Sequence, residues 1–79
     1  MESIADQWAR KQREALDSVL EWAGTPSALA KILGLNTQNV HGWIKRGRIS
    51  ATAAAKIDAI TKGKFKKTDI RPDVAEWWM

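Results

Sequence analysis

Residues 26–45, PSALAKILGLNTQNVHGWIK, constrain the fold most, because a glycine divides two short helical patterns at a fixed point. The pair Thr25-Pro26 favours a helix start, and Gly34 supplies the positive φ at which that helix can end. A second helical pattern follows after a three-residue turn and covers about residues 37–46. Two short helices joined in this way have the spacing of a helix-turn-helix.

The other segments also read as short helices, each starting at a capping residue and ending near a glycine. Their expected spans are Ser3 to about Ala23, the segment ATAAAKIDAIT between Ser50 and Gly63, and a last piece near residues 72–78 capped by Thr68 or Asp69. Only residues 64–70 carry a weak strand signal, and no turn joins two β-branched runs. We therefore predict an all-α fold, a small helix-turn-helix domain of about five short helices.

The apolar residues on the inner faces of these helices form the expected core. They are the stripe of Leu16, Val19, Leu20 and Ala23 in the first helix, and Leu29, Ala30, Leu33, Leu35, Val40, Trp43, Ile44, Ala54, Ile57 and Ile60 in the others. Ala30 is small where the second helix of the pair must cross close above it. Trp43 is expected to fill the wedge between the two helices.

Charge is distributed unevenly along the 79 residues. Lys and Arg number 13 against 9 Asp and Glu, a formal net charge of +4, yet residues 22–57 contain no acid at all. The bases in that stretch are Lys31, Lys45, Arg46, Arg48 and Lys56. Solubility alone would account for the net charge, but the acid-free stretch favours an anionic partner, above all nucleic acid.

Several classes of function are excluded by what the chain lacks. There is no Cys and only one His, so we expect no disulfide, thiolate nucleophile, metal site or cofactor. Ser27, Ser50 and His41 do not form a plausible catalytic triad, and no enzyme is predicted. The chain has neither an apolar run of membrane-spanning length nor a signal peptide, so a soluble cytoplasmic protein is expected.

Three segments, SALAKILGL, NVHGWIKRGRIS and TDIRPD, resemble those of phage Cro-type repressors and the similar YdaS-type regulators of bacterial prophages. The family pattern SALAxALGVxxxxVxxWxxRGRIP, then a helix and xDLRPD, is matched over about residues 15–74. Ser50 stands where Pro is common, and Gly42 where a polar side chain is frequent. The resemblance implies a Cro- or lambda-repressor-like fold and a repressor that binds operator DNA as a homodimer.

On this reading the helix over about residues 37–46 lies in the major groove, where Gln38 can pair with adenine N6 and N7. Asn36 can instead cap the helix, and His41 can be an idle surface residue. The predicted base contacts are Thr37, Gln38, His41, Asn36 and Lys45. The predicted phosphate contacts are Ser27, Arg46, Arg48 and Lys31. Lys56 is expected to be a solvated charge.

Residues 1–79 are expected to be a single DNA-binding domain, with an N-terminal helix extension over about 1–14 and a C-terminal tail over about 68–79. The chain has five Trp, four of them near its two ends. Aromatic residues are enriched at protein interfaces. The predicted dimer interface is Ile4, Trp8, Trp77 and Trp78. The rival interpretation is an intramolecular clasp, in which Trp77 or Trp78 packs on Trp8 or Trp22.

The function predicted first is a sequence-specific regulator that binds double-stranded operator DNA as a homodimer, formed in solution or only on DNA. The alternative is an antitoxin-like interaction module that neutralises a protein partner and can also regulate its own operon. Neither a membrane nor a small-molecule substrate is expected. Salt separates the two, because binding through Lys and Arg to phosphates falls steeply with salt.

Overall fold

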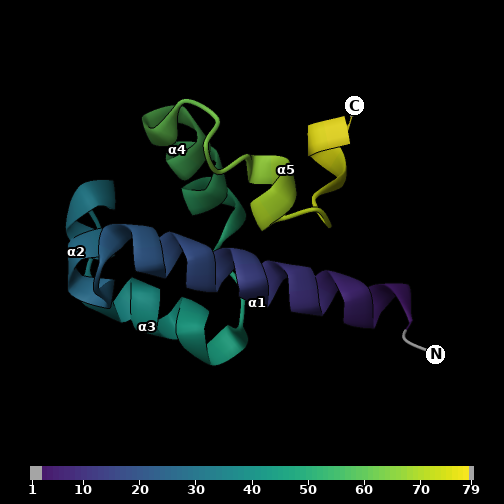
Figure 1. Cartoon of the computed structure of the whole chain (residues 1–79), viewed down its shortest axis with the longest axis horizontal. Helices are drawn as coiled ribbons and strands as arrows, with labels where there is room; N and C mark the ends of the chain where they lie inside the picture. The colour runs from purple at the N-terminus through teal and green to yellow at the C-terminus, as the bar shows by residue number, and fades with distance from the viewer. Residues whose placement is uncertain (1–2, 79) are drawn as a thin grey trace.

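The computed structural model describes residues 3–78, apart from the side chain of Trp78. Within this range the chain forms five α-helices and a final 3₁₀ helix, and no strand, so the all-α prediction is confirmed. The elements are α1 (Ile4–Ala23), α2 (Pro26–Leu33), α3 (Thr37–Arg46), α4 (Ala51–Thr61), α5 (Lys67–Ile70) and η1 (Ala75–Trp78) (Figure 1).

Local capping explains why the predicted helix starts are confirmed. In three helices a hydroxyl oxygen accepts a hydrogen bond from the backbone N–H three residues later, at 3.0 to 3.3 Å. Such a bond satisfies one of the N–H groups that a helix leaves unpaired at its start. The three capping residues are Ser3, Thr25 and Ser50.

The end of the chain differs from the prediction. Helix α4 ends at Thr61 with Lys62 in the left-handed region (φ 53°), one residue before the expected Gly63. Helix α5 begins at Lys67, whose N–H donates to the Asp58 carboxylate at 3.0 Å. Thr68 and Asp69 therefore lie inside a helix that they were expected to cap. The last helical piece, expected near residues 72–78, is the 3₁₀ helix η1 at Ala75–Trp78, and residues 64–70 contain no strand.

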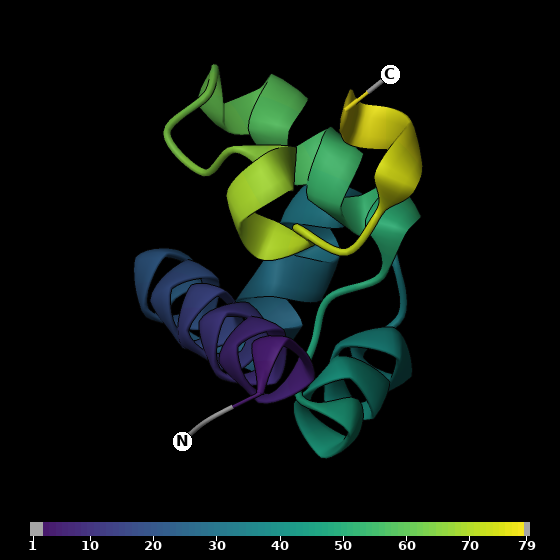
Figure 2. The ribbon, with the colours of Figure 1, turned by 90° about the vertical axis from the view of Figure 1, so that its right-hand side faces the viewer.

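The core forms where α1, α2, α3 and α4 meet, and α5 closes it. Figure 1 shows α1 running along the molecule, and Figure 2 shows α4, α5 and η1 stacked above α1 and α3. Full burial of a large aliphatic side chain stabilises a fold by about 1.5–3 kcal/mol. The buried apolar residues are Leu16, Val19, Leu29, Ala30, Leu33, Val40, Trp43, Ile49, Ala53, Ala54, Ile57 and Ile70.

Two predicted core residues are not in the core, and three residues that were not predicted are: Ile49, Ala53 and Ile70. Leu35 is 37% exposed in the turn before α3, and Ile60 is 45% exposed at the end of α4. Ile44 is only half-buried at the edge of the core. Ile49 and Ile70 are fully buried. Neither belongs to a helical apolar stripe long enough to be recognised in the sequence.

Candidate nucleic-acid interface

The turn between α2 and α3 fixes how the two helices meet. Gly34 has φ 69°, a conformation in which a side chain would be strained. Its N–H donates to the Lys31 carbonyl at 3.2 Å, and the N–H of Leu35 donates to the Ala30 carbonyl at 2.8 Å. These two bonds are those of a Schellman motif, which ends α2 and satisfies its last carbonyls.

Helix α3 buries one side and leaves the other in solvent. Val40 and Trp43 are 0% and 3% exposed. At about 100° per residue, Gln38 and Lys45 point away from that buried side. Both are exposed, and so is His41 next to them. The structure thus brings these three predicted base-contact residues together on one outward face.

The first turn of α3 is arranged differently from the expectation. Asn36 occupies the capping position and is exposed, but its side chain makes no capping hydrogen bond. Thr37 is half-buried. Asn39, which was not a predicted contact, is exposed and borders a groove of about 310 Å³ between α3 and α4. The amide of Asn39 is therefore as available for a ligand as that of Asn36.

Arg46, at the end of α3, lies back along the helix over Gly42. Its Nη1 and Nη2 atoms are 3.4 and 3.5 Å from the position that a Cβ atom on residue 42 would occupy. Long side chains on a helix extend toward its N-terminus, which accounts for the direction. The missing side chain at Gly42 leaves the space in which the guanidinium lies.

A network of charged groups follows α3. The Arg71 guanidinium donates to both carboxylate oxygens of Asp73, at 2.8 and 2.9 Å, and to the carbonyl of Ile49 at 3.1 Å. These hydrogen bonds hold the pKa of the Asp73 carboxyl below its ordinary value and raise that of Arg71. Burial opposes both shifts, while the positive charge of Arg48 further lowers the pKa of Asp73. The TDIRPD segment thus fastens the loop that carries Arg48.

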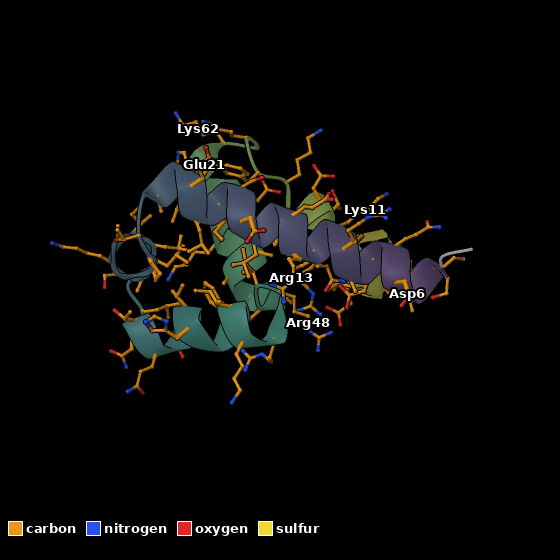
Figure 3. All side chains as sticks on the ribbon, turned by 60° about the horizontal axis from the view of Figure 1, so that its bottom comes forward. Asp6, Lys11, Arg13, Glu21, Arg48 and Lys62 are labelled. Carbon is orange, nitrogen blue, oxygen red and sulfur yellow. The ribbon has the colours of Figure 1, made fainter. Side chains whose placement is uncertain are left out.

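Arg13 of α1 lies at the C-terminal end of α3, which the sequence did not indicate. Gly47 there has φ 80°, and a Cβ atom on it would come within 2.9 Å of Arg13 Nη2. Figure 3 shows Arg13 and Arg48 together at this end of the helix. A cation at a helix C-terminus interacts favourably with the helix dipole, so Arg13 helps to hold α3 in place.

The predicted phosphate contacts are spread over three elements. Ser27 and Lys31 are exposed on α2, Arg46 on α3 and Arg48 on the following loop. Within residues 3–78 no partner is found for the Ser27 N–H, in the first turn of α2. Lys56 is not the plain solvated charge that was expected, because its Nζ donates to the Leu33 carbonyl at 2.8 Å.

The Trp residues at the two ends of the chain do not pack on one another in the described part. Trp22 contacts Phe65 edge to face, with ring centroids 5.7 Å apart. Trp77 is half-buried, and Lys67 Nζ lies 4.5 Å from its ring centroid. Its Nε1 is buried without a hydrogen-bond partner among the described residues. Trp78 was also a predicted interface residue, and its side chain lies outside the described part.

The other two predicted interface residues stand out on α1. Ile4 is 66% exposed and Trp8 is 41% exposed, one helical turn apart on a half of the helix that extends past α3 (Figure 1). Further along the same stripe Gln12 is buried. The exposed pair is consistent with a second copy or another partner covering it, and the dimer remains a prediction.

In the part of the chain that the structure describes, no helix is both long enough and apolar enough to cross a membrane. Within the same residues, no three side chains of the metal-binding types are placed to hold an ion together.

Comparison with known proteins gives one match. A family model described as bacterial toxin YdaS matches residues 16–78, about four fifths of the chain. No curated protein and no solved structure matches the chain. The matched range includes the whole helix-turn-helix and the segment with Arg71 and Asp73, and leaves out the entire N-terminal half of α1.

Proposed function

The chain belongs to the bacterial toxin YdaS family, and from that premise we propose that it is a sequence-specific DNA-binding regulator. It acts as a Cro-type repressor of a phage or prophage and binds operator DNA as a homodimer, with α3 in the major groove. One observation carries the proposal. The helix-turn-helix presents the exposed face of α3 within a stretch, residues 22–57, that contains no carboxylate.

Base reading falls to the outward face of α3. Gln38 is exposed near the N-terminal end of the helix, where recognition helices meet base edges. Its amide makes the bidentate pair with adenine N6 and N7. His41 and Lys45 extend the same face along the groove. Asn36 and Thr37, at the start of the helix, contact bases or the adjacent sugar.

Phosphate binding fixes the register of the complex. The open N–H of Ser27 at the N-terminus of α2 suits a phosphate oxygen, since helix N-termini attract anions. Lys31 and Arg48 supply positive charge around it. The network of Arg71 and Asp73 holds the backbone that presents Arg48.

The family description, which names a toxin, fits a DNA-binding chain. A regulator that occupies promoters blocks transcription without any chemical step, and such a block harms a cell that needs the transcript. No catalytic residue is required for this route to toxicity, and none is proposed.

A second candidate function is favoured by the exposed pair Ile4 and Trp8. On that reading the chain binds a protein through the N-terminal half of α1. An antitoxin-like chain would neutralise the protein that it binds. With the chain itself as the toxin that the family description names, the partner is instead its target or its neutraliser.

Selection from a pool of random duplexes, run at two salt concentrations, tests the proposal. We expect a short palindrome and an affinity that falls steeply with salt.

Gln38→Ala should cost about 1–3 kcal/mol on the recovered duplex and little on a scrambled one. Arg48→Ala should weaken both duplexes alike and reduce the salt slope by about one. Recovery of no motif, or equal losses for Gln38→Ala on both duplexes, contradicts the proposal.

A further inference from the structure

We infer that Arg46 reads a guanine in the major groove, rather than binding a phosphate, and that Gly42 is the residue that makes this possible. The inference rests on the proposed function, because it requires α3 to lie in the groove. It assigns a base preference to one side chain and gives the absence of a side chain at residue 42 a role in recognition.

The head group of Arg46 lies nearer to the N-terminal half of α3 than its own backbone does. Arg46 is the last residue of α3, while the N-terminal half of a recognition helix is the part that meets base edges. Its guanidinium lies over Gly42, with Cζ 3.7 Å from the position of a Cβ atom on that residue. The head group is thus about one helical turn, roughly 5.4 Å, nearer to the bases than its own Cα.

The face on which the head group lies supports the same inference. Residue 42 is half-buried and lies at the edge of the outward face, about 40° around the helix from Gln38 and about 100° from the buried Trp43. A guanidinium seated there is presented along with the predicted base contacts.

The unused hydrogen-bonding capacity of Arg46 also supports it. Among the residues that the structure describes, none forms an ion pair or a hydrogen bond with its guanidinium. No carboxylate occurs in residues 22–57 to compete for it locally. The planar fork of donors on an arginine matches the O6 and N7 acceptors of guanine, which is the commonest specific contact to a base.

Gly42 can be tested separately from Arg46, because a small side chain at residue 42 leaves room for the guanidinium and a large one does not. A Cβ atom would lie 3.4 Å from Nη1, an ordinary van der Waals contact, so Gly42→Ala leaves the guanidinium in place. The longer side chain in Gly42→Leu would occupy the space of the guanidinium and displace it. Both residues favour a helix over Gly, so neither variant loses binding by unfolding α3.

The experiment uses the duplex that the wild-type chain selects from the random pool, and copies in which one guanine at a time is 7-deazaguanine. This base lacks the N7 acceptor but keeps its pairing and its charge. For the wild type we expect one position per half-site at which the replacement weakens binding roughly 5- to 150-fold. Arg46→Ala should bind the unmodified duplex more weakly than the wild type does. Replacing any one guanine by 7-deazaguanine should then weaken its binding no further. Arg48→Ala should bind more weakly and keep the effect.

The variants of residue 42 complete the test. Gly42→Ala should keep the sensitivity to 7-deazaguanine, and Gly42→Leu should lose it while its helix content stays that of the wild type. The inference is overturned if Arg46→Ala keeps the sensitivity, or if Gly42→Leu behaves as Gly42→Ala does. Selection that recovers no motif overturns the proposed function as well, so the two failures are distinguishable.

Discussion

Arg71 shows at the scale of one residue how the C-terminal segment serves the candidate site. Its guanidinium joins the carboxylate of Asp73 to the carbonyl of Ile49, which is the residue after Arg48. A bidentate pair with a carboxylate is geometrically specific as well as strong. The backbone that follows α3 is therefore held by a residue more than twenty positions later in the chain.

Asp73→Asn gives this network a signature in pH. The folded-state pKa of Asp73 is below its unfolded value of about 3.9, so the ionised form stabilises the fold above that pH. This contribution is lost as the pH falls through the folded-state value. We expect Asp73→Asn to lower the free energy of unfolding in urea at pH 7, and the difference from wild type to shrink below about pH 4. The exposed Asp69→Asn is the control, and a difference that is constant with pH would contradict the pairing.

Lys56 acts at the scale of the helical elements, because it links α4 to the end of α2. Its Nζ donates at 2.8 Å to the carbonyl of Leu33, one of the last carbonyls of α2. Lys56→Met keeps the apolar stem and removes the donor, which should cost about 1 kcal/mol. In a domain of this size that lowers Tm by roughly 4–8 °C. Lys45→Met, on the exposed face of α3, is the matched control, and equal Tm values for the two variants would argue against the link.

The elements that the sequence predicted are those whose signals are local. Ser3, Thr25 and Ser50 cap helices through bonds that span three residues, so their neighbours reveal them. The start of α5 was missed because Lys67 is capped by Asp58, a residue on another helix. Lys62 adopts the left-handed conformation that was expected of Gly63 at the end of α4. Conformational propensity favours Gly over Lys in this region, so it does not predict this helix end.

In the candidate site, too, the sequence predicted the features that depend on local spacing and missed those that depend on distant residues or on side-chain conformation. Helical periodicity was enough to place Gln38 and His41 outward. The position of Arg46 over Gly42 depends on a side-chain conformation, which no spacing rule supplies. Arg13 and Arg71 were missed because their partners at the end of α3 are distant in sequence.

Self-association belongs to the scale of the whole molecule. Ile4 and Trp8 extend an apolar stripe of α1 beyond the body of the domain, where the structure leaves them exposed. The double variant Ile4→Ala/Trp8→Ala should therefore weaken dimerisation in analytical ultracentrifugation without changing helix content. Trp77→Ala is the less informative variant, because Trp77 is half-buried against Lys67 and its loss also disturbs the fold. An unchanged association constant for the double variant would remove α1 from the dimer interface.

The surface that we propose meets DNA consists of α3 and the residues around it. Titration of the isotope-labelled chain with the selected duplex, followed through its backbone amide resonances, tests this claim most directly. We predict that the largest shift changes fall on residue 27 and residues 36–48, and that residues 4–14 change little. Changes centred on residues 4–14, with residues 36–48 unmoved, would contradict the account.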